Sequence, residues 1–159
     1  MRDFYYPIAL KMKDKRAMVA GGGRVAERKV RALLGFGAEV RVVSPDLTAP
    51  LRELFQSRKI TWLNRVVRAS DINGADIIIA ATSDAVVNRK ISTWAKRHGA
   101  LVNVVDRAEL SDFISPAILR KSKAVVAVYT HGRDPVLSRD LKNFLKENWD
   151  AFLSYRNRL

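Results

Sequence analysis

A glycine-rich segment near the N-terminus, Gly21-Gly22-Gly23-Arg24-Val25-Ala26, has residue types suited to binding a pyrophosphate. It fits the pattern G-x-G-x-x-G/A, in which Gly21 permits a tight turn, Gly23 lets a phosphate approach the backbone and the small Ala26 lets a helix pack close to a sheet. A helix beginning here would offer free N–H groups and a partial positive charge to the phosphates. The segment predicts dinucleotide binding; a purely structural turn is the alternative, because glycine-rich turns are common.

The segment Ser44-Pro45-Asp46 lies where dinucleotide-binding proteins ordinarily carry an acidic residue that holds the ribose. Ser44 takes that position, and Asp46 follows two residues later. No arginine stands there to hold a 2′-phosphate, although Arg41 is near in sequence. The spacing predicts a cofactor contact here and leaves the choice between NAD and NADP open.

Two later segments carry polar residues at the ends of apolar runs. The small residues around Thr82 and Ser83 leave room for a cofactor across the strand ends, and a helix N-cap by Ser83 or Asp84 is a compatible alternative. A polar Asn103 interrupts the later run, and a carboxylate at its end, Asp106, can accept a proton as a hydride leaves. Asp106 is the predicted catalytic residue, with a turn-forming aspartate as the alternative. The residues predicted to contact the cofactor are Gly21, Gly22, Gly23, Arg24, Val25, Ser44, Pro45, Asp46, Thr82, Ser83, Asn103 and Val105.

Other catalytic and metal-binding chemistries find little support. The two histidines form no metal-ligand spacing: His98 precedes a glycine at an expected helix end, where a cation suits the helix dipole, and His131 lies in a loop where it could touch substrate. The sequence has no cysteine, which excludes disulfides, thiolate metal sites and cysteine nucleophiles. We therefore predict no bound metal.

The elements around these residues alternate between strand and helix. Strands are expected at 17–20, 39–43, 60–63, 75–81 and 100–105, and helices at 25–34, 47–55 and 84–98. Because helices separate consecutive strands, the sheet should be parallel and covered on both faces.

The pattern changes after Asp112, which predicts a cofactor domain over 1–112 and a smaller region over 113–159. Two apolar runs, 113–119 and 124–130, have no helix between them and predict a β-hairpin. Asp134 and Pro135 supply an N-cap and a first-turn proline for one final helix that runs to the C-terminus. The predicted fold class is α/β, a Rossmann-like parallel sheet followed by a small hairpin-plus-helix region for dimerisation, since that region is too small to fold alone.

The chain of 159 residues is strongly basic, with 29 Lys and Arg against 16 Asp and Glu and a formal charge of +13. Such a surface attracts anions, whether nucleic acid, anionic lipid or a polyanionic small molecule, or simply keeps the protein soluble. The aromatic residues do not interleave with the basic ones as a nucleic-acid platform requires. No apolar run is long enough for a membrane span, and no signal peptide is recognisable, so we expect a cytoplasmic protein without nucleic-acid or membrane partners.

Together, several segments make the chain resemble the precorrin-2 dehydrogenase / sirohydrochlorin ferrochelatase family, the module that siroheme synthases also contain. The resemblance runs over nearly the whole chain, from Tyr6 to about Leu145, and the glycines followed by V-A-E-R-K, with N-V-V-D about 80 residues later, are its most specific part. The matching segments are Tyr6-Pro7-Ile8, 21–29, Val43-Ser44-Pro45, 80–84, 103–106, 112–116 and 134–139.

The resemblance implies an NAD-dependent dehydrogenase that oxidises precorrin-2 to sirohydrochlorin, with Asp106 as the essential residue and a homodimer as the assembly. It also implies a partner for the positive charge, because precorrin-2 carries acetate and propionate arms. We expect Ser115, His131 and Arg133 to contact this substrate.

Three alternatives stay open. Some family members also insert Fe²⁺, and this chain is short, so iron insertion is a separate question. A non-catalytic NAD-binding regulatory module would share the glycine loop without needing Asp106. The loop from Thr130 to Asp134 is bulkier and more charged than the Gly- and Ser-rich loop of many members, and Thr130 takes the place of a serine that is a phosphorylation site in some.

Overall fold

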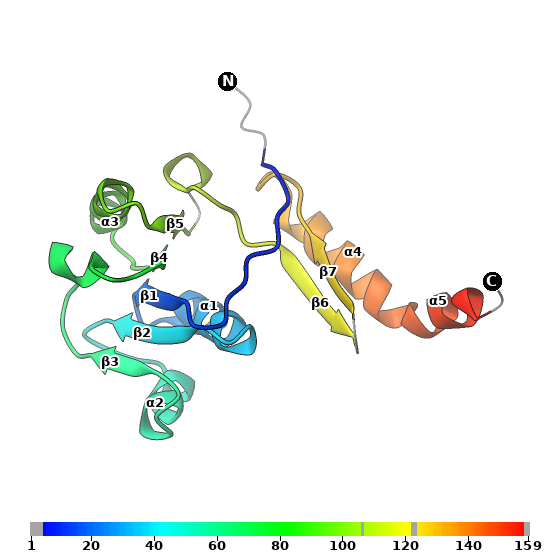
Figure 1. Ribbon diagram of the computed structural model, residues 1–159, viewed down its shortest axis with the longest axis horizontal. Helices are drawn as coiled ribbons and strands as arrows, with labels where there is room; N and C mark the ends of the chain where they lie inside the picture. The colour runs from blue at the N-terminus through cyan, green and yellow to red at the C-terminus, as the bar shows by residue number, and fades with distance from the viewer. Residues whose placement is uncertain (1–4, 106, 122–123, 158–159) are drawn as a thin grey trace. The chain divides into compact units, whose positions relative to one another are not determined.

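The computed structural model describes residues 5–105, 107–121 and 124–157 (Figure 1). These residues form two compact units. One unit runs from Pro7 to Phe113 and contains the glycine-rich segment, whereas the other combines Tyr5 and Tyr6 with the residues from Ile114 onward.

The first unit is built on a parallel sheet whose strand order is β3-β2-β1-β4-β5 (Figure 1). Its strands are β1 (Arg16–Ala20), β2 (Glu39–Val43), β3 (Thr61–Leu63), β4 (Ile77–Ala80) and β5 (Leu101–Val104). The connecting helices are α1 (Arg24–Gly35), α2 (Ala49–Gln56) and α3 (Ala85–Arg97), with the short 3-10 helices η1 (Ala69–Ile72) and η2 (Ala108–Leu110). The α/β fold with a parallel sheet is therefore confirmed, and the chain order reverses between β1 and β4, where open α/β sheets bind ligands.

The alternating side chains of the central strands supply two cores. Ala17 and Val19 of β1 belong to a buried cluster with Ala26 and Val30 of α1 and Leu51 of α2. The intervening residues of β1 point to the other face, where the cluster includes Met18, Ile78, Ile91 and Ala95. Both faces of the sheet are thus covered by helices, which explains why β4, Ile77–Ala80, is buried along its whole length.

The outer edge of β5 is covered by the segment that follows η2. The Asp112 N–H donates to Val102 O at 2.8 Å, and the Asp112 carboxylate accepts the Val102 N–H at 3.0 Å. The Ser111 hydroxyl accepts the Val104 N–H at 2.9 Å. These bonds satisfy backbone groups that an open edge strand would expose, so the sheet ends at β5.

The second unit contains an antiparallel hairpin, β6 (Ala117–Lys121) and β7 (Ala124–Val128), as expected. The expected first strand begins too early at 113, because the strand starts only after Pro116, which has no N–H to donate to a ladder. The hairpin packs against α4 (Pro135–Glu147), whose N-cap Asp134 accepts the Leu137 N–H at 2.7 Å.

The prediction of one final helix is wrong, because α5 (Trp149–Arg156) is a separate helix after α4. Asn148 separates the two with φ −96° and ψ 15°. Its side-chain amide donates to Phe144 O at 2.9 Å, and that carbonyl also accepts the Asn148 N–H at 3.0 Å. Asparagine favours such local hydrogen bonds over continued helix, which accounts for the break.

Candidate functional site

The first glycine of the motif makes the turn that leaves β1. Gly21 has φ +112°, a conformation that side chains rarely adopt, and is buried. A Cβ at this position would lie 2.3 Å from Ala81 O. Gly21 is therefore required both for its backbone angle and for the close approach of the segment that follows β4.

The middle glycine carries a constraint that its sequence position does not reveal. A Cβ on Gly22 would lie 1.9 Å from Asp46 O and 2.9 Å from the Ser44 hydroxyl oxygen. The Gly22 carbonyl accepts the Thr48 N–H at 2.9 Å. The segment from Ser44 to Thr48 thus lies directly against the glycine loop, and only glycine fits at the point of contact.

The third glycine faces open space at the N-terminus of α1. Gly23 is exposed, has an ordinary φ of −82°, and a Cβ there would meet nothing within 4 Å. As the N-cap of α1 it provides no side-chain hydrogen bond, so the N–H groups of the first turn, including those of Arg24 and Val25, are not capped by a side chain. An uncapped helix start with room beside it fits the pyrophosphate of a dinucleotide, which these N–H groups would hold.

The segment after β2 is held by β3 and by α1. The Ser44 N–H donates to Leu63 O at 3.2 Å, and the Trp62 indole N–H donates to Ser44 O at 2.9 Å. Glu27 of α1 accepts the Thr48 hydroxyl at 2.9 Å. Hydrogen bonds from Arg31 and then from Thr48 lower the pKa of the Glu27 carboxyl, so Glu27 is ionised and ties α1 to this segment.

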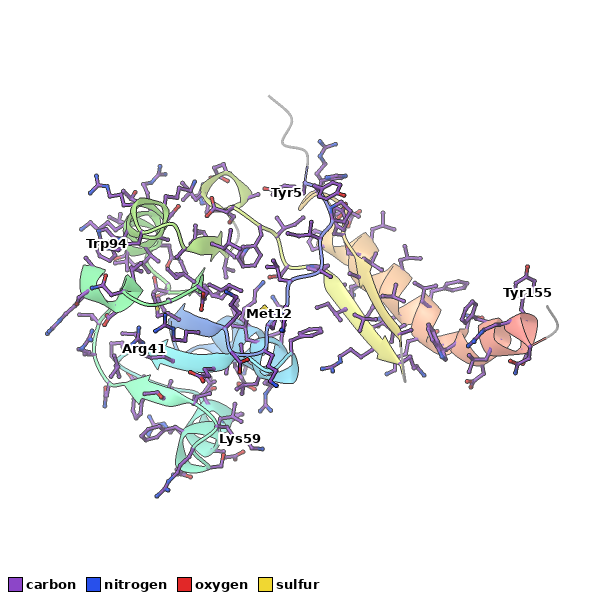
Figure 2. All side chains as sticks on the ribbon, viewed as in Figure 1. Tyr5, Met12, Arg41, Lys59, Trp94 and Tyr155 are labelled. Atoms are coloured by element: carbon purple, nitrogen blue, oxygen red, sulfur yellow. The ribbon has the colours of Figure 1, made fainter. Side chains whose placement is uncertain are left out.

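Asp46 is the exposed acid of this segment, and its side chain is 92% exposed with Arg52 at 3.8 Å. An exposed carboxylate here is available to a ribose hydroxyl. Arg41, labelled in Figure 2, instead donates from Nη2 to Asp71 O at 2.8 Å. Among the described residues its Nε has no partner. Pro45 is exposed next to Asp46 and contributes no polar group.

The segment after β4 is arranged by hydrogen bonds to α3. The Thr82 N–H donates to Asn88 Oδ1 at 3.1 Å, and the Thr82 hydroxyl lies 2.7 Å from the same oxygen. Asp84 is the N-cap of α3 and accepts the Val86 and Val87 N–H groups at 2.7 and 3.1 Å. The N-cap interpretation of Asp84 is confirmed, and Ser83 is left exposed at the strand end.

At the end of β5, Asn103 is 6% exposed and donates from Nδ2 to Phe113 O at 2.9 Å. Its Oδ1 is buried and has no partner among the described residues, which is uncommon for a buried polar atom. The Val105 N–H donates to Ala80 O at 3.0 Å and so aligns the ends of β5 and β4. Asp106, the predicted catalytic residue, lies outside the described residues.

The structure thus brings the ends of four strands to one edge of the sheet. Gly21 approaches Ala81, Gly22 approaches Ser44 and Asp46, and Val105 bonds to Ala80. Sequence reasoning missed Trp62, Glu27 and Thr48, which hold the segment after β2 in place. The side-chain hydrogen bonds concerned join residues 18 and 21 positions apart in sequence, so no local pattern signals them.

The three residues expected to contact substrate belong to the second unit. Ser115, His131 and Arg133 are exposed there. His131 has φ +53°, an uncommon conformation for a side-chain-bearing residue, and its ring meets that of Tyr129 at 5.2 Å. The Thr130 hydroxyl donates to Asp134 O at 2.7 Å and accepts the Asp134 N–H at 3.0 Å, so it orders this loop at the start of α4.

His98 occupies the end of α3, as expected, and its Nδ1 lies 2.9 Å from Trp94 O. The described residues contain no group of three or more His, Cys, Asp or Glu side chains that could hold a metal ion. In the described part of the chain no helix combines the length and the apolar character that a membrane crossing requires.

A sequence family described as NAD(P)-binding matches residues 8–117. The chain is 46% identical to the siroheme synthase of Methylococcus capsulatus and 42% identical to that of Chromobacterium violaceum, in each case over 138 residues. These alignments cover 87% of this chain and 29% of each relative, so the chain spans less than a third of their length.

A solved structure titled SirC, precorrin-2 dehydrogenase, has a TM-score of 0.78 and is 27% identical. It matches 91% of this chain and 71% of its own chain, so the likeness includes both units of the fold. These matches confirm the resemblance inferred from the motifs, because the chain is similar both to siroheme synthases and to a precorrin-2 dehydrogenase. The chain belongs to the NAD(P)-binding family that it matches over residues 8–117.

Proposed function

We propose that this chain is an NAD-dependent dehydrogenase that oxidises precorrin-2 to sirohydrochlorin in siroheme formation. The observation that carries the proposal is the similarity to a solved precorrin-2 dehydrogenase over 91% of the chain. The open, uncapped start of α1 at Gly23 supports cofactor binding at the place where such a reaction needs it. We place the reaction in the cytoplasm as part of the same proposal.

In this proposal the chain's residues bind and orient, and one of them moves a proton. The N–H groups of Arg24 and Val25 hold the pyrophosphate, and the exposed Asp46 holds the ribose of the adenosine half. NAD⁺, when bound, supplies a hydride acceptor. Asp106, which follows Val105 in the sequence, accepts the proton that the substrate loses with the hydride.

The substrate's acetate and propionate arms account for the positive charge of the chain. Guanidinium and ammonium groups form the strongest hydrogen bonds to carboxylates. His131 and Arg133 are exposed in the loop before α4, and Ser115 is exposed before β6. We assign these three residues to substrate binding.

The homodimer is also part of the proposal. α4 exposes large apolar side chains that a soluble monomer would leave in water; they are Val136, Leu137, Leu141 and Phe144, each 44–58% exposed. A second copy of the chain would cover them across a two-fold axis. The functional division would then be a cofactor domain over 1–112 and a dimerisation and substrate region over 113–159.

The test is turnover of precorrin-2 with NAD⁺, followed by NADH absorbance and by the sirohydrochlorin spectrum. The wild type should produce both signals together, and Asp106→Ala should retain NAD⁺ affinity and lose turnover. A wild type that binds NAD⁺ without any turnover would instead support a non-catalytic NAD-binding module. No turnover with either NAD⁺ or NADP⁺ would refute the dehydrogenase.

Iron insertion requires its own measurement. Siroheme formation from sirohydrochlorin and Fe²⁺ is compared with and without the protein under anaerobic conditions. A rate equal to the background indicates a dehydrogenase alone, whereas a rate that depends on Asp106 indicates that one site performs both reactions.

A further inference from the structure

Trp62 of the edge strand β3 holds the backbone of Ser44 although it lies 18 residues away in sequence. Its indole N–H donates to Ser44 O at 2.9 Å, and the carbonyl of the next residue, Leu63, accepts the Ser44 N–H at 3.2 Å. The backbone N–H and C=O of Ser44 therefore both form hydrogen bonds with residues of β3.

Ser44 begins the segment that rests on the glycine loop. Asp46 O lies so close to Gly22 that a Cβ there would be 1.9 Å from it, and the Gly22 carbonyl accepts the Thr48 N–H. A shift of this segment would displace the exposed Asp46 and would change the surface against which Gly22 packs. The position of Ser44 thus determines the place available to the adenosine half of a dinucleotide.

β3 itself is short, only Thr61–Leu63, and needs support to hold its neighbour. The ring of Phe55 on α2 meets the Trp62 ring edge-on at 5.5 Å and 79°. Beyond the strand, Arg65 forms two hydrogen bonds of 2.6 and 2.8 Å with the carboxylate of the buried Asp71. The indole is therefore presented from a fixed direction, which is what a single positioning hydrogen bond requires.

We infer that Trp62 is a positioning residue for cofactor binding: through its hydrogen bond to Ser44 O it fixes the segment after β2 against the glycine loop and so preorganises the site for the adenosine half of NAD. The inference rests on the cofactor use of the proposed function. It extends that function to a residue that is not among the predicted cofactor contacts and has no place in the dinucleotide-binding motif.

The test compares Trp62→Phe, which keeps an aromatic ring beside Phe55 and removes the indole N–H, with the matched control Trp94→Phe. Trp94, labelled in Figure 2, lies on α3 and packs, partly buried, against the core cluster on the other face of the sheet from Trp62. Binding of three probes is measured by calorimetry: NAD⁺, ADP-ribose, and nicotinamide mononucleotide, which lacks the adenosine half. Loss of one neutral hydrogen bond should weaken NAD⁺ and ADP-ribose about 3- to 10-fold in Trp62→Phe.

Affinity for nicotinamide mononucleotide should be unchanged in Trp62→Phe, and Trp94→Phe should leave all three affinities unchanged whatever it does to the melting temperature. In turnover, KM for NAD⁺ should rise in Trp62→Phe with kcat preserved. Unchanged affinities in Trp62→Phe, or equal losses for all three probes, would overturn the positioning role. A wild type that binds neither NAD⁺ nor ADP-ribose would overturn cofactor use as well.

A measurement on the wild type covers the case in which Trp62→Phe does not fold. The Trp62 indole N–H resonance is assigned by elimination from the Trp94→Phe and Trp149→Phe variants. It should shift when ADP-ribose binds and stay in place with nicotinamide mononucleotide. An indole signal that does not respond to ADP-ribose would contradict the inference.

Discussion

Replacing Gly23 by alanine should remove most of the cofactor affinity without harming the fold. A Cβ at Gly23 meets nothing within 4 Å, and the φ of −82° suits any residue. The added methyl group would, however, occupy the space beside the uncapped first turn of α1, where the pyrophosphate must approach. The same type of change at Gly22 has the opposite structural consequence, because the methyl carbon would lie 1.9 Å from Asp46 O.

The magnitudes follow from these contacts. Alanine at Gly23 restricts the unfolded chain, which stabilises the folded state by about 0.4–1 kcal/mol. Alanine is also a poorer N-cap than glycine, which acts in the opposite direction, so the net change in stability should stay within about 1 kcal/mol. Loss of the charge-assisted bonds to a phosphate should cost about 1.5–3 kcal/mol of binding, or roughly 10- to 100-fold. Alanine at Gly22 would push the backbone at Asp46 away from the glycine loop and should cost about 1–3 kcal/mol of stability, or about 3–10 °C in Tm.

The assay is thermal unfolding and NAD⁺ titration of the wild type and both variants at one protein concentration. Gly23→Ala should have the melting temperature of the wild type and bind NAD⁺ weakly. Gly22→Ala should have a lower melting temperature and also bind NAD⁺ weakly. Wild-type affinity in Gly23→Ala would show that the pyrophosphate does not lie against this turn, and the assignment of the helix start would fail. A Gly22→Ala variant as stable as the wild type would refute the close contact with Asp46.

Three further perturbations test separate parts of the structure. The hydrogen bonds from Arg65 hold the pKa of the Asp71 carboxyl below its ordinary value of 3.8. The ionised Asp71 therefore contributes fully to the stability of the folded state above pH 3.8, and this contribution is lost as the pH falls through the lowered native pKa. Asp71→Asn should therefore lower the free energy of unfolding by about 2 kcal/mol at neutral pH, and this free energy should fall less steeply below pH 3.8 than in the wild type. Urea unfolding at a series of pH values measures both effects, and equal slopes for the two proteins below pH 3.8 would contradict the prediction. Asp84→Ala removes the N-cap of α3 and should lower the free energy of unfolding in urea by about 1 kcal/mol. An unchanged midpoint of urea unfolding would argue against the cap. Phe144→Lys places a charge on the exposed apolar face of α4 and should convert the proposed homodimer to a monomer in light scattering. A dimer that persists in this variant would place the interface elsewhere.

Local patterns were sufficient to predict the α/β architecture. β-Branched and apolar runs, glycines at the ends of helices and the Asp134-Pro135 pair are signals that act within a few residues of where they occur. The same local reasoning failed at Asn148, because an apolar stripe continues past a residue whose own side chain competes for a helix carbonyl.

The sequence by itself determined the glycine turn, the family and the set of strand-end residues, because each depends on residue type and spacing along the chain. Only the tertiary structure decided why Gly22 must be glycine and why Ser44 stays in place, since both depend on Asp46, Trp62 and Leu63 arriving from separate segments. The physical reason is that neither a hydrogen bond between neighbouring strands nor a van der Waals contact between backbones requires a pattern of residue types in the two segments. Such contacts exist only once the parallel sheet has set β2 between β1 and β3.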